Sequence, residues 1–371
     1  MIDVASLPHM DVRGRTQRLR ALFPDADCDA LLLTKLVNIR YLTGFTGSAA
    51  MLLVTPTGAT FVTDGRYRDQ STDQLSAAWV AADIVIGLSQ GEQLRALVAA
   101  ASAAEVARLG LEADAVSWAQ HRSFTTAFAG TELVPTDGLV DGLRMVKEPA
   151  EVERIRAACA IADDALGELL PTLREGPTER NFALRLEFAM RERGASGVSF
   201  DPIVAAGPNG AKPHARPSDR PIGAGELVVI DFGCVVDGYC SDMTRTVSVG
   251  EPSIDARRIW DTVLDAQRAG CDAVRPGAEC AAVDGASRDV IAGAGWADAF
   301  VHGTGHGVGL EIHESPRVAS TSTGTLAPGH VVTVEPGVYL SGIGGVRIED
   351  TLVVTEAGAT ALTEFPKTLV V

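Results

Sequence analysis

The sequence predicts an α/β N-terminal domain over residues 1–140 and an α+β C-terminal domain with a pseudo-twofold repeat over residues 144–371. Two observations lead to this fold class. The first 140 residues alternate short apolar segments with segments suited to helices, which is typical of a small α/β domain. The remainder contains one arrangement twice, a pair of helices followed by an apolar strand that ends in a carboxylate. A length of 371 residues accommodates two such domains.

The apolar segments of the N-terminal domain are expected to form strands. DALLLT (29–34) has the composition of a strand, and AMLLVTPTGATFVTD (50–64) that of a hairpin with its turn at Pro56-Thr57-Gly58. We expect further short strands within 79–87, 107–113 and 131–137, and helices around 66–78, 90–104 and 117–128. This domain carries no obvious chemical motif, so the residues that carry chemistry are expected after residue 144.

The C-terminal domain is expected to begin with a long helix that has one buried face. Pro149 suits its first turn, and apolar side chains then recur at helical spacing at Ile155, Cys159, Ala162, Leu166 and Leu169. A Gly-Pro break precedes a second helix over about 178–193. The same plan recurs after residue 252, with helices over about 253–270 and 279–293.

Each helix pair is followed by strands that share the same pattern of glycine and acidic residues. In Gly225–Asp231 and in Gly329–Glu335, a glycine opens an apolar strand that ends in a carboxylate six residues later. A second carboxylate then follows in each half, with a threonine two residues further on, at Asp242–Thr244 and Glu349–Thr351. This weak repeat has a period of about 105 residues. It predicts that acids from both halves meet at the centre of the domain.

These four acids lie where carboxylates are costly. LVVIDFGCVVDGYCSDMTRTVSV (227–249) is typical of a hairpin with its turn at Asp237-Gly238, which would place Asp231 nearly opposite Asp242, allowing for a bulge. Facing carboxylates repel each other, and burial in an apolar strand adds a desolvation cost. A single acid of this kind would be interpreted as facing solvent near a turn. Four related acids, with Glu335 and Glu349 on the second hairpin, favour a site for divalent metal ions.

The stretch HGTGHGVGLEIHE (302–314) supplies a fifth donor. It holds three of the seven histidines, and His306 lies between two glycines that let the backbone approach a buried site. Two aspartates, two glutamates and one histidine provide enough donors for two ions. The HExxH motif of zinc proteases is absent, and the glycine-rich stretch lacks the GK[ST] of a phosphate-binding loop.

Composition excludes other classes of function. A formal net charge of −16 argues against binding of nucleic acid. No apolar run approaches the roughly 20 residues of a membrane span, and the start lacks the pattern of a secretory signal. The six cysteines are scattered, without a CxxC motif, and are interpreted as reduced thiols. We therefore expect a cytoplasmic protein without a membrane partner.

The five donors, in the order Asp231, Asp242, His306, Glu335 and Glu349, resemble the ligand set of the pita-bread metallopeptidases. The strings IDFG, SDMTRT, HGTGHGVGLEIHE, VEPG and RIED are similar to motifs of the same family. This resemblance covers the C-terminal domain. NIRYLTGFTGS (38–48) and TDGRYRDQ resemble the N-terminal domain of the proline-specific branch, which includes aminopeptidase P and prolidase. The expected fold is therefore a creatinase N-terminal-like domain followed by a pita-bread catalytic domain of the creatinase/aminopeptidase type.

The resemblance implies a site for two divalent metal ions, with Mn²⁺ expected first and Co²⁺ or Zn²⁺ as alternatives. It implies that Asp242 and Glu349 bridge both ions, that Asp231 binds one, and that His306 and Glu335 bind the other. It also implies hydrolysis of the bond between an N-terminal residue and proline, by attack of a hydroxide that bridges the ions. The family further suggests a homodimer that acts on proline-containing peptides.

Further roles follow from the same resemblance. His214 matches a histidine near the proline side of the substrate, and His302 one that lines the pocket. His313 matches the histidine that donates a hydrogen bond to the scissile carbonyl, and Arg347 an arginine beside the metal site. Glu335 is the candidate proton shuttle between the attacking water and the proline nitrogen.

Two alternatives remain open at this point. Aminopeptidase P acts on longer peptides, whereas prolidase accepts only dipeptides and must recognise a free carboxylate. Arg40 is a candidate for binding that carboxylate or, equally, for a surface ion pair. Relatives of this fold also include the metal-free enzyme creatinase and peptide-binding modules, but all five ligand positions hold competent residues here, which argues against both.

Overall fold

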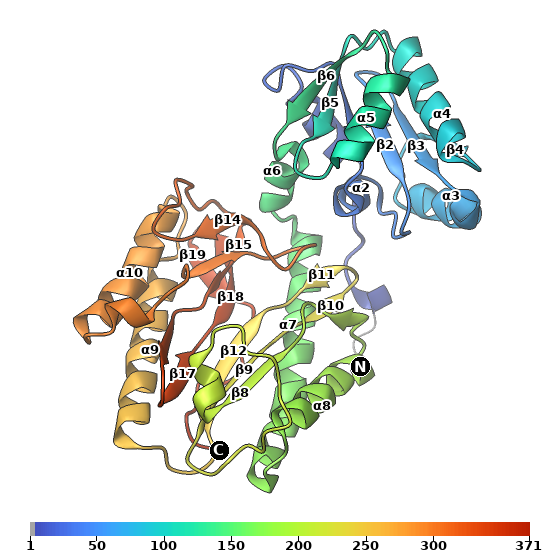
Figure 1. Ribbon diagram of the computed structural model, residues 1–371. Helices are drawn as coiled ribbons and strands as arrows, with labels where there is room; N and C mark the ends of the chain where they lie inside the picture. Colours follow the sequence, from blue (N-terminus) through green and yellow to red (C-terminus); the bar gives the residue numbers. More distant parts are fainter. Residues whose placement is uncertain (1–3) are drawn as a thin grey trace. The chain divides into compact units, whose positions relative to one another are not determined.

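The computed structural model describes residues 4–371, except for the side chain of residue 5. The chain divides into two compact units (Figure 1). One comprises His9–Arg144, and the other comprises Met145–Val371 together with the described residues that precede His9. The expected domains were 1–140 and 144–371, whereas the described residues before His9 lie in the unit that contains Met145–Val371. One contact that holds it there is the hydrogen bond from Arg154 Nη1 to the carbonyl of Pro8, at 2.9 Å.

The N-terminal unit is built on one six-stranded sheet with the order β4-β3-β2-β1-β5-β6. β1 pairs in parallel with β5 and antiparallel with β2, so the sheet is mixed. The strands are β1 (Ala30–Leu33), β2 (Met51–Val54), β3 (Ala59–Thr63), β4 (Asp83–Ile86), β5 (Arg108–Glu112) and β6 (Glu132–Thr136). Each expected strand is present, and β2 and β3 form the expected hairpin.

Helices alternate with these strands along the chain. They are α1 (Arg15–Arg20), α2 (Leu36–Thr43), α3 (Arg68–Ala77), α4 (Gln90–Ala103), α5 (Trp118–Ala127) and α6 (Leu139–Met145). Leu97 of α4 and Phe124 of α5 pack with Leu32 and Leu109 of the sheet in one buried cluster. The predicted α/β architecture is therefore confirmed.

The larger unit contains the two expected helix pairs. They are α7 (Pro149–Leu169) with α8 (Glu179–Glu192), and α9 (Ile254–Ala273) with α10 (Cys280–Gly293). The residues expected on the inner face of the first helix are all buried. Thr178 and Ser253 cap α8 and α9, which satisfies backbone N–H groups at the helix starts. In the described part of the chain, no helix combines the length and apolar character needed to cross a membrane.

The strands of the larger unit lie between these helix pairs (Figure 1). One sheet has the order β12-β9-β8 and another the order β14-β13-β15-β18-β19. The first contains β8 (Ile203–Ala206), β9 (Leu227–Phe232) and β12 (Met243–Ser248). The second contains β13 (Gly305–Gly307), β14 (Glu314–Val318), β15 (Val331–Val334), β18 (Asp350–Thr355) and β19 (Gly358–Ala361). Shorter pairings involve β7 (Gly197–Val198), β10 (Cys234–Val236), β11 (Tyr239–Cys240), β16 (Gly337–Leu340) and β17 (Gly344–Arg347).

The first hairpin departs from its predicted register. Asp237 and Gly238 both have positive φ, 45° and 80°, as a two-residue hairpin turn requires. A turn of this length pairs Val236 with Tyr239, and the same register sets Asp231 opposite Thr244 rather than near Asp242. The predicted alignment is therefore wrong by two residues. Side chains alternate between faces with a period of two, so the offset still leaves both acids on one face.

The second hairpin places its acids directly across from each other. Val334 pairs with Asp350, and Gly337 pairs with Arg347. Glu335 and Glu349 lie between these two pairings, where the flanking register makes them opposite neighbours. The two halves of the repeat therefore bring their acids together by different registers.

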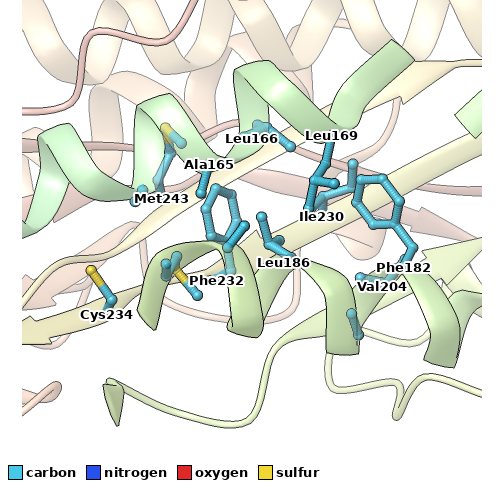
Figure 2. Close-up of a cluster of buried hydrophobic side chains, with 14 of the residues drawn as sticks. Ala165, Leu166, Leu169, Phe182, Leu186, Val204, Ile230, Phe232, Cys234 and Met243 are labelled. Atoms are coloured by element: carbon cyan, nitrogen blue, oxygen red, sulfur yellow. The ribbon is translucent and has the colours of Figure 1, made fainter. Parts of the chain in front are cut away.

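A core of apolar side chains supports the first half. Figure 2 shows side chains of α7 and α8 meeting those of the β8-β9-β12 sheet. Phe182 and Leu186 of α8 contact this cluster together with Ile230 and Phe232 of β9, and all four are fully buried. Because strand β9 ends at Phe232, this packing fixes the position of the adjacent Asp231.

We expect that truncating Leu186 destabilises the larger unit. Leu186→Ala should lower the free energy of unfolding by about 2–5 kcal/mol, because it leaves a cavity in the core. Leu184→Ala on the same helix is the control, since Leu184 is 60% exposed and its loss should change stability by less than about 0.5 kcal/mol. Urea unfolding of both variants measures the difference. Equal stabilities of the two variants would contradict the packing described.

Candidate metal centre

The two halves of the repeat meet through reciprocal hydrogen bonds. Thr244 Oγ1 donates to Glu349 Oε2 at 2.7 Å, and Thr351 Oγ1 donates to the carbonyl of Asp242 at 2.8 Å. The backbone N–H of Glu349 also donates to the carbonyl of Thr244, at 3.1 Å. Each threonine that follows an acid in one half therefore holds the corresponding acid of the other half. The repeated spacing revealed these threonines, but their role emerges only from the structure.

His306 points its free nitrogen at the acids. Its Nδ1 lies 3.0 Å from the carbonyl of Gly307, and its Nε2 lies 3.5 Å from Asp242 Oδ2 and 3.5 Å from Glu335 Oε1. One ligand atom from each of Asp242, His306 and Glu349 lies within 4.8 Å of the others. The structure therefore brings predicted donors from both halves into one cluster.

The glycine before His306 allows this approach. A Cβ atom at Gly305 would lie 1.9 Å from the carbonyl oxygen of Thr333 on the neighbouring strand. No residue with a side chain fits there without moving the backbone of β15. The expectation that flanking glycine permits close packing around His306 is thus met at Gly305.

Two carboxylate oxygens in the cluster lack a hydrogen-bond donor. Asp231 Oδ1 and Glu349 Oε1 are buried and have no partner among the described residues. The other oxygen of Asp231 accepts from Arg347 Nη2 at 2.5 Å. Buried oxygens without donors are costly unless a cation supplies the missing interaction. Oxygen donors with one imidazole suit a divalent metal ion, so the residues present fit such a group.

The charges of the acids conflict with one another in the absence of a cation. Burial, followed by the charges of Glu349 and Asp231, raises the pKa of Asp242 well above its usual range. Burial and the charge of Glu349 raise the pKa of Glu335 in the same way. The pKa of Glu349 rises to about 8, chiefly through burial and then through Asp231. Conversely, burial lowers the pKa of His306 to about 4, which keeps its imidazole neutral and able to bind a metal ion.

Arg347 links the acids to the neighbouring side chains. Its buried guanidinium donates to Asp231, to Thr244 Oγ1 at 3.2 Å, and to Tyr339 Oη at 2.7 Å. Tyr339 Oη in turn lies 2.9 Å from His302 Nε2. Burial raises the pKa of Tyr339 to about 12, so the phenol stays protonated at neutral pH. Tyr339 was missed by the sequence reasoning, because nothing in the string GVYL distinguishes it from a strand residue that packs in the core.

Three further histidines were predicted to line the site. The rings of His313 and His306 meet edge to face, with centroids 4.3 Å apart. His302 is bound to Tyr339 as described, and burial lowers its pKa to about 4. Burial also lowers the pKa of His313, whereas His214 is exposed. His313 therefore lies against His306, and His302 is connected to the acid cluster through Tyr339 and Arg347. For His214 the connection runs through the backbone, where Arg347 Nη1 donates to the carbonyl of the preceding Pro213.

A pocket opens beside His313. Its volume is about 530 Å³, and Leu310–His313 form one wall. Ser199, Val235, Gly238 and Cys240 line the remainder. The pocket is connected to the acid cluster through His313, whose ring contacts that of His306. Arg40, the candidate carboxylate reader, lies half-buried in α2 of the N-terminal unit.

Removing divalent cations should make stability depend on pH. Because the pKa of Glu349 is raised from 4.5 to about 8 on folding, the folded chain binds this proton more tightly than the unfolded chain. The stability it contributes is full below the unfolded pKa and is lost as pH rises through the folded pKa. Chelator-treated protein should therefore show a falling free energy of unfolding between about pH 5 and pH 8.

Glu349→Gln should reduce this slope, since the amide does not titrate. Glu356→Gln, at an exposed position, is the control and should retain the slope of the wild-type protein. Chemical unfolding at several pH values in a chelating buffer provides the measurement. A slope that Glu349→Gln leaves unchanged would mean that this carboxylate does not titrate as its burial implies.

Known protein families and solved structures are similar to this chain over most of its length. Residues 153–356 match the model of metallopeptidase family M24, and residues 15–146 match the creatinase/prolidase N-terminal domain. The uncharacterized peptidase YqhT of Bacillus subtilis is 40% identical over 96% of this chain and 99% of its own length. The Xaa-Pro dipeptidase from Bacillus anthracis superposes with a TM-score of 0.93 at 39% identity, covering 97% of this chain and all of its own. The X-Pro aminopeptidase from Thermotoga maritima gives 0.87 at 34%, covering 96% of this chain and all of its own. The chain has the pita-bread fold and belongs to metallopeptidase family M24.

Proposed function

We propose that this metallopeptidase hydrolyses the bond between an N-terminal residue and proline, with Xaa-Pro dipeptides as its first substrate. The observation that carries the proposal is the buried cluster of acids around His306, in which Asp231 Oδ1 and Glu349 Oε1 lack a donor among the described residues. Family membership and the similarity to a dipeptidase and an aminopeptidase that are both named for proline substrates support it.

The proposed cofactor is a pair of divalent metal ions. Asp231, Asp242, His306, Glu335 and Glu349 would hold them, and four carboxylates with one imidazole favour Mn²⁺ over softer ions. When bound, such ions lower the pKa of water and polarise a carbonyl oxygen, which is the chemistry that peptide hydrolysis needs.

The residues of the chain would then divide the remaining work. Glu335 takes a proton from the attacking water and delivers it to the proline nitrogen, which is a poor leaving group as an anion. His313, whose ring borders the pocket, donates a hydrogen bond to the carbonyl oxygen as negative charge develops there. His302, oriented by Tyr339, and Arg347 shape the wall of the site. His214 contacts the proline side of the substrate.

The cellular setting is part of the same proposal. All six cysteines are free, which suits a reducing compartment such as the cytoplasm. A homodimer follows from the family resemblance, and Arg40 as a reader of the substrate carboxylate stays a prediction. The domain limits 1–140 and 144–371 are proposed as the functional division, with the catalytic residues all in the second.

Substrate length is tested with metal-stripped protein, assayed with and without added Mn²⁺. We expect Mn²⁺-dependent cleavage of an Xaa-Pro dipeptide and little cleavage of the same dipeptide extended by one residue. Product analysis by chromatography provides the measurement. Cleavage of the longer peptide would make the protein an aminopeptidase P, and no cleavage of either with metal bound would refute a proline-specific peptidase.

The role of Glu335 is tested by Glu335→Gln, which keeps an oxygen donor but removes the group that carries the proton. We expect kcat to fall by about 10²- to 10⁴-fold. The metal content, measured by elemental analysis, should stay near that of the wild type. Glu356→Gln is the matched control on the surface. Near-normal turnover with metal bound would exclude Glu335 as the proton shuttle.

A further inference from the structure

The loop that carries His214 has an unusual anchor. We define the His214 loop as residues 207–218, which leave strand β8 and begin with the short helix η4 (Gly207–Ala211). The imidazole of His214 is exposed, so packing around the ring does little to fix it. The position of this imidazole therefore depends on how the backbone of the His214 loop is held.

One buried carboxylate holds the loop near both ends. Glu179, the first residue of α8, is fully buried. It accepts hydrogen bonds from the backbone N–H of Ala206 at 2.7 Å and from the backbone N–H of Ser218 at 3.0 Å. Ser218 Oγ also donates to it at 2.6 Å, and Asn209 Nδ2 at 3.0 Å. Residues on either side of His214 are thus tied to a single side chain.

These donors require a carboxylate. Two backbone N–H groups, one amide and one hydroxyl converge on two oxygens, and an ionised glutamate accepts at both without donating. A glutamine at this position would turn an NH₂ group toward the N–H of either Ala206 or Ser218. Neither backbone group can accept, so one buried donor would lose its partner.

The middle of the loop contacts strand β17 and Arg347, which lie next to the acid cluster. A Cβ at Gly345 of β17 would lie 2.0 Å from the carbonyl oxygen of Gly210, so the two backbones are in close contact. Arg347 Nη1 donates to the carbonyl of Pro213 at 3.3 Å, one residue before His214. Arg347 also binds Asp231, so the loop backbone connects directly to the acid cluster.

We propose that Glu179 is a positioning residue that holds His214 where it meets the proline side of the substrate. The inference rests on the proposed function for the role of His214. In this proposal, His214 makes the contact that recognises proline, and its loop is held near both ends by Glu179 and at its middle by Arg347. Without Glu179, the loop loses four hydrogen bonds near its two ends and keeps the bond from the Arg180 N–H to the carbonyl of Ser218 and its contacts with β17 and Arg347. His214 then samples positions in which it misses the substrate.

The first test measures the loop without any turnover. Glu179→Gln in metal-free protein should raise amide hydrogen exchange in residues 207–216, while exchange in β9 and β18 stays unchanged. Glu192→Gln, an exposed glutamate on the same helix, should leave both unchanged. Exchange that rises equally across the larger unit would mean that Glu179 serves global stability, which would overturn the proposal.

The second test is a double-mutant cycle with His214→Ala, measured as kcat/KM on an Xaa-Pro dipeptide. Glu179→Gln should lower kcat/KM about tenfold in the wild-type background and less than about twofold in the His214→Ala background, because residues that act through one group are not additive. Equal losses in both backgrounds would overturn the proposal. If Glu179→Gln does not fold, Ser218→Ala, which removes one donor, should show the same coupling at smaller amplitude.

The two tests separate this inference from the proposed function. Absence of proline-specific cleavage by the wild-type protein would refute the proposed function and with it the role assigned to His214. Cleavage by the wild-type protein with an additive cycle would leave the proposed function standing and remove Glu179 from it.

Discussion

The larger unit depends on one electrostatic constraint: carboxylates from two hairpins are buried together. Their mutual repulsion and desolvation raise the pKa of Asp242, Glu335 and Glu349, so the cluster is unfavourable as a set of free anions. The surrounding fold is arranged to hold the acids in place. Helices α7 and α8 pack behind β9, and the reciprocal threonine bonds lock the hairpins against each other. These contacts therefore keep the carboxylates buried, although each of them would be more stable as an anion in solvent.

Arg347 shows how one cation serves several purposes in this setting. It neutralises part of Asp231, orients Tyr339 and through it His302, and holds the carbonyl before His214. A guanidinium suits this position because it offers five donors in a plane and stays charged when buried. The acids that would bind metal and the side chains that would meet substrate are therefore connected through a single residue. We expect changes in one set to be felt in the other.

Much of this architecture could be predicted from local patterns. Helical spacing from Ile155 to Leu169 predicted α7. The paired acids and the glycine-flanked His306 predicted the buried acid cluster, because desolvated charge in an apolar strand needs an explanation. The offset of Asp231 from Asp242 was misjudged, although the two-residue turn at Asp237-Gly238 determines it.

Other features depend on tertiary contacts that leave no local pattern. Tyr339 looks like any strand residue until Arg347 and His302 are placed around it. Glu179 follows a helix-capping threonine, so its position is typical of an ordinary first-turn acid, and its four donors come from residues 27 to 39 positions away. The assignment of the first described residues to the larger unit likewise depends on a contact with Arg154, far along the chain.

The reciprocal bonds of Thr244 and Thr351 have a consequence for how such a centre can be built at all. Each half supplies the hydroxyl that secures the other half's acid, so one half alone would need a second copy of itself, related by a twofold axis, to complete the arrangement. Because both halves lie in one chain, they meet within a single molecule at a high effective concentration, and no association of two copies is needed. It also releases the halves from being identical. One half carries aspartates and the other glutamates, and the shorter and longer side chains reach a shared centre from hairpins of different register.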